Sequence, residues 1–212
     1  MGEGMRPEEI ERESFAIIDA EAGDHGWGER EWQIVRRMIH TTADFSWVTD
    51  TILSPSLVER GIAAIYRGRG VVTDTRMALS GISRHLLDRY GVEGNCIVSD
   101  PLVVRRAAEL GVTRSTLAMQ VALSRRDTGI VVIGNAPTAL RELVRMIREE
   151  SLRPDLVIAL PVGFVDAAES KEAFVAVARD AGIPFISNRG RKGGSAVAAA
   201  AMNALLRLAD QG

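Results

Sequence analysis

Apolar side chains recur at helical spacing through the first third of the chain. Between residues 7 and 21 they stand among charged residues, which predicts an amphipathic helix with Pro7 at its start. The same spacing predicts helices over residues 29–39 and 55–66. We therefore expect residues 1–66 to be mainly helical.

From residue 70 the pattern changes to short β-branched runs that alternate with helical stretches. The predicted strands cover residues 70–75, 95–99, 129–134, 155–160 and 183–187, and the predicted helices cover residues 77–90, 101–110, 115–126, 138–150, 171–181 and 195–209. Strands that are apolar on both faces and separated by helices are typical of a parallel sheet covered on both sides. The pattern predicts a three-layer α/β fold with a mostly parallel sheet of about five or six strands. No repeat or long linker interrupts the sequence, so we expect one domain over residues 1–212, in which residues 1–66 pack on an α/β core of residues 70–212.

The composition is that of a globular protein. Of the 212 residues, 46% are hydrophobic and 25% are charged, which excludes disordered and fibrous classes. The formal net charge of −2 argues against a nucleic-acid-binding protein, and no apolar run reaches the roughly 18 residues of a membrane span. The acidic amino-terminal segment does not resemble a signal peptide, and the single cysteine, Cys96, allows no internal disulfide. We expect a cytoplasmic domain that binds neither nucleic acid nor membrane.

Arginine almost replaces lysine in this chain. Of the 26 basic residues only Lys171 and Lys192 are lysines, and the other 24 are arginines. A genome whose codons favour arginine explains such a bias. A surface that binds carboxylates or phosphates explains it too, because the planar guanidinium can donate two parallel hydrogen bonds to such groups.

Polar residues, glycines and an arginine gather at the predicted strand ends: residues 73–75, 99–100, 134–135, 161–164 and 188–190. In sheets of this kind, ligands bind outside the carboxyl ends of the strands. No G-x-G-x-x-G follows a strand and no G-x-S-x-G is present, so dinucleotide binding and serine hydrolysis lack their motifs. The sequence therefore predicts a site of another kind at this edge.

The segment GRKGGS over residues 190–195 is the clearest candidate for anion binding. Its glycines let the backbone approach a ligand, and the helix predicted to begin at residue 195 presents free N–H groups. Arg189, Arg191 and Lys192 add positive charge. The alternative is a tight turn that only caps the helix.

Three further residues have both a functional and a structural interpretation. His40 ends a predicted helix, where it could transfer protons or only bind the last carbonyls. Asn135 could face a ligand or cap the next helix, and Phe164 could contact a flat apolar ligand or rest on a helix. The other histidines, His25 and His85, show no metal-ligand spacing, so we expect no metal site.

Taken together in order, five segments resemble the precorrin-8X methylmutase family, also called cobalt-precorrin-8 methylmutases. They read RMIHTTADF, VVTDTRMALSGI, IGNAPTAL, PVGFVDAAESKEAF and IPFISNRGRKGGSAVAAAAMNAL. The resemblance extends from residue 13 to residue 206, which is nearly the whole chain. It implies a flavodoxin-like fold and a homodimer with active sites near the subunit interface.

The resemblance also implies an isomerase of cobalamin biosynthesis that needs no cofactor. Such an enzyme moves a methyl group of a corrinoid from ring carbon 11 to ring carbon 12 and gives hydrogenobyrinic or cobyrinic acid. His40 matches the family's catalytic histidine, for which we expect the role of general acid. The expected substrate-binding residues are Ser14, Thr41, Arg114, Asn135, Gly163, Phe164, Arg189, Lys192, Gly193 and Gly194.

Two departures and two alternatives accompany this interpretation. The family often has glycine at the position of Ala43, and uncharged residues at the position of Asp166. A catalytically silent corrinoid-binding or carrier protein would share the motifs but would not need His40. A nucleotide-binding regulator of flavodoxin-like fold would copurify with its nucleotide.

Overall fold

The computed structural model describes residues 6–125 and 128–211, which contain helices and strands in alternation. In chain order they are α1 (Pro7–Ala22), α2 (Glu29–Thr42), α3 (Trp47–Asp50), β1 (Thr51–Leu53), α4 (Leu57–Tyr66), β2 (Gly70–Thr73), α5 (Arg76–Gly81), α6 (Arg84–Arg89), β3 (Gly94–Asn95), α7 (Pro101–Leu110), α8 (Arg114–Leu123), β4 (Thr128–Ile133), α9 (Pro137–Glu149), β5 (Leu156–Ala159), α10 (Ala167–Asp180), β6 (Phe185–Asn188) and α11 (Ser195–Asp210). Most of the predicted elements lie within a few residues of their predicted bounds.

A six-stranded sheet with the order β1-β6-β5-β4-β2-β3 forms the middle of the molecule. All neighbouring strands are parallel except β1, which pairs antiparallel with β6. The five parallel strands, counted along the chain, follow the order 2-1-3-4-5 of flavodoxin-like folds. The predicted three-layer α/β fold with a mostly parallel sheet is confirmed. Its strand order reverses between β2 and β4, which is where ligands of doubly wound folds bind.

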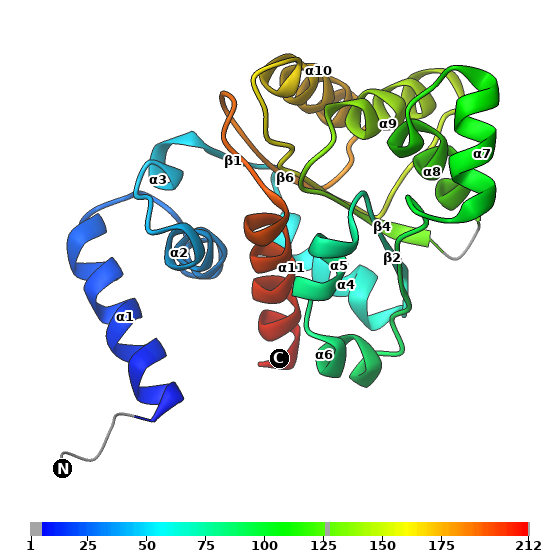
Figure 1. Cartoon of the computed structure of the whole chain (residues 1–212). Coiled ribbons are helices and arrows are strands. Elements are labelled where there is room, and N and C mark those ends of the chain that lie inside the picture. Colours follow the sequence, from blue (N-terminus) through cyan, green and yellow to red (C-terminus); the bar gives the residue numbers. More distant parts are fainter. Residues whose placement is uncertain (1–5, 126–127, 212) are drawn as a thin grey trace, which may run out of the picture.

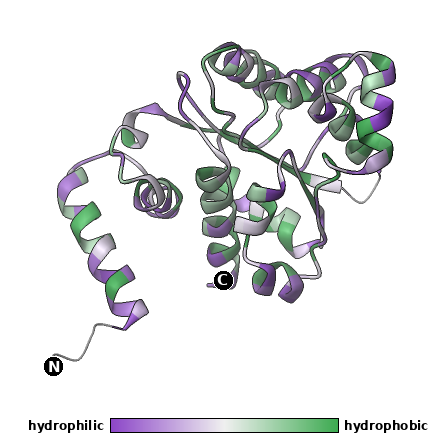
Figure 2. Ribbon diagram, in the orientation of Figure 1, coloured by the Kyte–Doolittle hydropathy of each residue, from purple (hydrophilic) through white to green (hydrophobic). Residues whose placement is uncertain are grey.

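Alternate residues of each central strand enter two separate hydrophobic cores. Ile130 and Val132 of β4 face the core formed with α2, α4 and α11, whereas Val131 and Ile133 face the core formed with α8, α9 and α10. Figure 1 shows these helices on opposite sides of the sheet, with α1 at the periphery beyond α2. Hydrophobic colouring follows the strands and α11, while polar residues mark the outer helix faces (Figure 2).

The helix predicted over residues 77–90 is wrong as a single element, because the chain breaks it at Ile82 and Ser83. Ile82 is extended, and the Ser83 hydroxyl accepts the Leu86 N–H at 3.4 Å to begin α6. Asn203 of α11 holds the break: its Oδ1 accepts the Ser83 N–H at 2.8 Å, and its Nδ2 donates to the Gly81 carbonyl at 2.8 Å. A side chain more than 100 residues away in the sequence therefore decides where this helix ends.

Other differences concern short elements and the start of one helix. The pattern of the sequence predicted neither α3 nor β1, and β3 is shorter than the strand expected over residues 95–99. Helix α10 begins at Ala167 rather than at residue 171. Arg126, the last residue of the helix predicted over 115–126, lies outside the described residues. Three-residue and two-residue strands carry too little periodicity to be recognised without their partners.

The start of α11 lies against the ends of β4 and β5 at backbone contact distance. The Gly194 N–H donates to the Leu160 carbonyl at 2.9 Å. A Cβ atom added to Gly134 would lie 2.6 Å from the Ser195 Cα, and one added to Gly193 would overlap the Leu160 carbonyl. Only glycine allows helix and sheet to come this close.

We expect Gly134→Ala to lower the free energy of unfolding by about 1–3 kcal/mol, because the new methyl group would push α11 from the sheet. Gly61→Ala is the control, because its added Cβ would lie 3.5 Å from the Leu156 and Leu205 side chains, an ordinary contact. Alanine at this position of α4 should be neutral or stabilise by about 0.5–1 kcal/mol. Urea denaturation of both variants measures the difference, and equal stabilities would contradict the close packing.

Candidate active site

His40 lies in the last turn of α2 with its side chain exposed. Its ring stands edge-on to Phe15 of α1, with 5.2 Å between the ring centroids. The opposite side of α2 buries apolar residues, among them Val35 and Ile39, and packs on α11. The amphipathic pattern of this helix thus directs its imidazole away from the core.

A cavity of about 310 Å³ opens beside His40 between α1 and α2. Its lining is mostly apolar, with Ser14, Glu21 and His40 as polar members. The Ser14 hydroxyl donates to the Ile10 carbonyl at 2.8 Å, so its oxygen stays free to accept a further hydrogen bond. Thr41 does not belong to this lining; its hydroxyl donates to the Arg37 carbonyl at 2.9 Å. The structure therefore brings Ser14 and His40 to one cavity and leaves Thr41 beside it.

Ala43 ends α2 in the left-handed conformation, with φ 51° and ψ 35°. Its N–H donates to the Ile39 carbonyl at 2.7 Å, which closes the last turn directly after His40. This conformation costs a residue with a Cβ about 1 kcal/mol more than it costs glycine, so Ala43 closes the helix at a small energetic cost.

The glycine-rich loop formed by residues 189–194 is held from inside the protein by Lys171. This side chain is 1% exposed, and its Nζ donates to the Asn188 Oδ1 at 3.0 Å and to the Lys192 carbonyl at 2.6 Å. The Asn188 Nδ2 donates to the Arg189 and Lys192 carbonyls, both at 2.9 Å. Burial, and then the charge of Lys192, lower the pKa of Lys171 to about 8, against an opposing effect of Asp50.

From outside, the side chains of the glycine-rich loop contact the segment of residues 44–50 that follows His40. The Lys192 Nζ lies 3.2 Å from Asp44 and 3.0 Å from Asp50, and 4.5 Å from the centre of the Trp47 ring. The Arg189 guanidinium donates to the Thr49 carbonyl at 2.9 Å. Hydrogen bonds from Ser46, together with Lys192, lower the pKa of Asp44. The glycine-rich loop and the end of α2 are thus linked by charged contacts.

At the reversal of strand order, Asp74 accepts three backbone N–H groups. They belong to Gly134, Asn135 and Ala136, at 3.0, 2.8 and 2.7 Å. Asp74 is 2% exposed; burial raises its pKa, and the three hydrogen bonds oppose that rise. The sequence places Asp74 at a strand end but does not by itself predict that its carboxylate binds these backbone N–H groups. The available signal is an aspartate that follows a buried strand and faces a glycine-containing turn. Since its carboxylate occupies these N–H groups, they are not free for a ligand anion.

The remaining predicted residues lie around this edge of the sheet. Asn135 is exposed, and Arg114 is exposed at the first position of α8, where Thr113 accepts the Thr116 N–H at 3.1 Å. The Phe164 side chain is 88% exposed, with the Arg191 guanidinium 5.9 Å from its ring centre. Gly163 has φ 153°, and its N–H donates to the Arg191 carbonyl at 3.2 Å.

The predicted residues other than Thr41 thus fall into three groups. Ser14 and His40 share the α1–α2 cavity; Arg189, Lys192, Gly193 and Gly194 form the glycine-rich loop with Gly163 and Phe164 next to it; Arg114 and Asn135 lie where the strand order reverses. The segment of residues 44–50 links the first two groups. Among the hydrogen bonds and ion pairs of the described residues, none joins Arg114 to either of them.

A match to a family model decides how this arrangement is classified. The model described as precorrin-8X methylmutase (CbiC) matches residues 9–208. The chain belongs to the precorrin-8X methylmutase family. It is therefore a methylmutase of cobalamin biosynthesis, which is an isomerase.

Similar proteins cover almost the whole chain. The cobalt-precorrin-8 methylmutase of Priestia megaterium is 43% identical, with 98% of this chain and 91% of the relative aligned. The precorrin-8X methylmutase of Sinorhizobium sp is 40% identical over 93% of both chains. A crystal structure of the precorrin-8X methylmutase from Thermus thermophilus superposes with a TM-score of 0.87 and 43% identity over 95% of this chain and 96% of that one.

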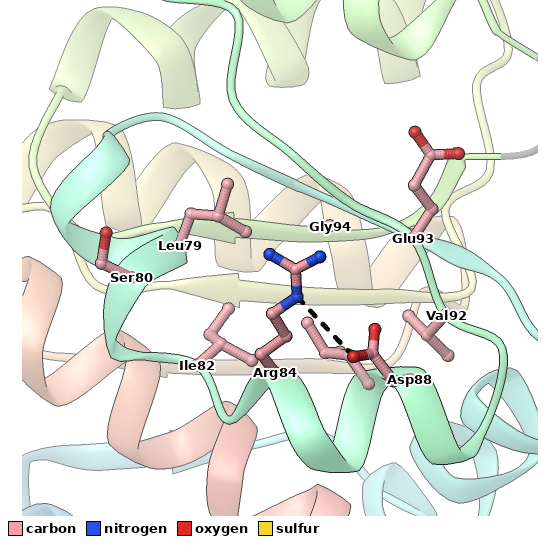
Figure 3. Close-up of a pocket in the computed structure, with 9 residues that line it drawn as sticks. Leu79, Ser80, Ile82, Arg84, Asp88, Val92, Glu93 and Gly94 are labelled. Atoms are coloured by element: carbon pink, nitrogen blue, oxygen red, sulfur yellow. Dashed lines mark ion pairs between the residues drawn. The ribbon is translucent and has the colours of Figure 1, made fainter.

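The described part of this family member has another cavity away from the predicted residues. It measures about 470 Å³ and lies between α5, α6 and the edge strand β3, with Arg84 and Asp88 facing each other at 3.6 Å (Figure 3). None of the predicted site residues lines it. The same described residues contain no cluster of three His, Cys, Asp or Glu side chains that could hold a metal ion, and no helix long and apolar enough to span a membrane.

Lys171 should make the stability of the methylmutase depend on alkaline pH. Its pKa is 10.5 without perturbation and about 8 in the folded protein. Between these values the unfolded chain binds the proton and the folded protein does not, so the free energy of unfolding rises with pH. Relative to Lys171→Met, the wild-type protein should therefore gain stability from pH 8 to pH 10.5. Urea denaturation at several pH values measures this, and parallel pH profiles would contradict it.

Proposed function

We propose that this methylmutase moves a methyl group from ring carbon 11 to ring carbon 12 of precorrin-8X or cobalt-precorrin-8. The product would be hydrogenobyrinic acid or cobyrinic acid. The observation that carries the proposal is the exposed imidazole of His40 on the wall of an open, mostly apolar cavity. Such a wall suits a flat conjugated ring, and imidazole readily gives and takes a proton near neutral pH.

In the proposed reaction His40 acts as general acid. It donates a proton or a hydrogen bond to the macrocycle near the migrating carbon, which draws electron density out of the conjugated system and lowers the barrier to migration. The proton returns to His40 after the methyl group has moved, so the reaction neither gains nor loses atoms. An acid in a fixed position contributes about 10²- to 10⁴-fold to such a rate.

The other predicted residues are proposed to bind the substrate's acetate and propionate arms and its ring. Arg114 is exposed and able to bind a carboxylate with two hydrogen bonds, and the exposed ring of Phe164 suits contact with the macrocycle. The exposed side-chain amide of Asn135 offers hydrogen bonds at the same edge. Gly163 and Gly194 donate their N–H groups to the Arg191 and Leu160 carbonyls, so we propose that these glycines, with Gly193, shape the backbone next to the substrate. Arg189 and Lys192 already bind residues 44–50. We therefore propose that these two residues also hold the glycine-rich loop in its shape.

Conversion of precorrin-8X and of cobalt-precorrin-8, followed by absorption spectroscopy, tests the proposal. We expect His40→Asn to lower kcat about 10²- to 10⁴-fold with little change in KM, because the proton donor is lost. The control is His85→Asn on α6, an exposed histidine outside the α1–α2 cavity, which should keep full activity. Near-normal turnover by folded His40→Asn would refute the general acid. Tight binding without conversion by the wild-type protein would instead support a corrinoid carrier.

We also propose that the enzyme is a homodimer whose interface includes α1. This helix packs on α2, yet Ile10 and Ile17 remain 52% and 51% exposed. Ile17 also lines the cavity beside His40, so a second subunit on this face would narrow that cavity. A cytoplasmic location and the lack of a nucleic-acid partner stay predictions, supported by the single cysteine and the net charge of −2.

Sedimentation at micromolar concentration should show a dimer, and Ile17→Glu should shift it toward monomer because a charge would be buried at the interface. Ala176→Glu introduces the same charge at an exposed position of α10, on the other side of the sheet, and should leave the dimer intact. A monomeric wild-type protein, or equal behaviour of both variants, would contradict this interface.

A further inference from the structure

We propose that Lys171 is a positioning residue for the reaction: beneath the glycine-rich loop, it fixes that loop against residues 44–50, which continue the chain from His40. This inference rests on the proposed function. It assigns to a buried lysine that does not line the α1–α2 cavity an effect on how the parts of the site are arranged.

The inner side of the glycine-rich loop depends on the Lys171 ammonium. Two of its three protons have acceptors, the Asn188 side chain and the Lys192 carbonyl. Asn188 is 1% exposed and binds the same Lys192 carbonyl through its amide, so lysine and asparagine converge on one backbone oxygen. Burying a charge is costly, and here the charge is compensated by these two acceptors.

Lysine is the appropriate cation for this position. The chain uses arginine at 24 of its 26 basic positions, yet Lys171 and Lys192, its two lysines, meet at this loop. A compact ammonium directs its donors to two acceptors in a small buried space, whereas a planar guanidinium needs more room. A codon bias toward arginine would not explain lysine at these two positions.

The outer side of the glycine-rich loop connects Lys171 to the end of α2 through the Lys192 side chain. Lys171 fixes the backbone of Lys192, and the Lys192 side chain reaches Asp44, Asp50 and the Trp47 ring. The Trp47 Nε1 donates to the Thr42 hydroxyl at 2.9 Å, two residues after His40. An unbroken series of contacts therefore runs from Lys171 to the turn that carries the proposed general acid.

A lysine that only stabilises the core would give a different result from a positioning residue. Loss of a core contact lowers the melting temperature and leaves the folded enzyme active. Loss of positioning lowers kcat of the folded enzyme, because displacement by about 1 Å can cost up to about 100-fold in rate. The effect of a Lys171 substitution on kcat should also depend on whether the contact between Lys192 and residues 44–50 is intact.

The test is a double-mutant cycle with kcat and KM on the corrinoid substrate as readouts. Lys171→Met should lower kcat about 10- to 100-fold. Asp44→Asn, which keeps an acceptor for Ser46 but loses the charge that faces Lys192, should lower it less. The double variant should be no slower than Lys171→Met alone, because both changes break one series of contacts. Independent effects that multiply, or a Lys171→Met kcat within about twofold of wild type, would overturn the proposal.

Two further variants keep the outcome interpretable. Phe174→Leu alters the same helix in the core, where its ring packs on Phe185 with 5.6 Å between centroids, and should lower the melting temperature without lowering kcat. Lys171→Gln keeps hydrogen-bond donors if the methionine variant folds poorly, and should have a kcat between those of wild type and Lys171→Met. A kcat for Lys171→Gln equal to that of wild type would show that no charge is needed and would overturn the assignment. An inactive wild-type enzyme would refute the proposed function instead.

Discussion

The close approach of α11 to the carboxyl ends of β4 and β5 is the constraint on which the rest of the structure depends. Gly134 and Gly193 have no Cβ, so backbone meets backbone, and the Gly194 N–H reaches the Leu160 carbonyl at 2.9 Å. Helix α11 is rich in alanine and buried along its length, and α2, α4 and α5 pack on it. Helix α2 carries His40 and packs on α11. The distance between α11 and the sheet therefore sets the position of the imidazole relative to the sheet.

Charges buried at the same edge give the loops their shape. Asp74 holds the turn after β4 through three backbone N–H groups, and Lys171 holds the glycine-rich loop through two acceptors. In many folds of this class a ligand's phosphate occupies N–H groups at the switch point. Here a carboxylate of the protein does so, which fits the absence of a dinucleotide fingerprint from the sequence. The edge is left to present Asn135, Phe164 and the glycine-rich loop to a ligand of another kind.

Long, strongly periodic segments were predictable because their pattern reflects burial directly. The strands around residues 130 and 157 are apolar on both faces since each face meets a helix layer, and α2 shows its apolar side because α11 covers it. Short elements were not predictable. The strand β1 exists because it pairs with β6, and the break between α5 and α6 exists because Asn203 binds both sides of it.

By itself the sequence determined the fold class, the family and the residues that gather at the carboxyl edge, because hydrophobic period and motif order are local properties of the chain. Only the tertiary structure decided what those residues touch. It turned Lys192 toward Asp44 and Asp50, placed Ser14 with His40, and left Arg114 at a separate part of the edge. Side-chain contacts between distant segments depend on how helices and strands pack, and packing is a property of the whole chain rather than of any one segment.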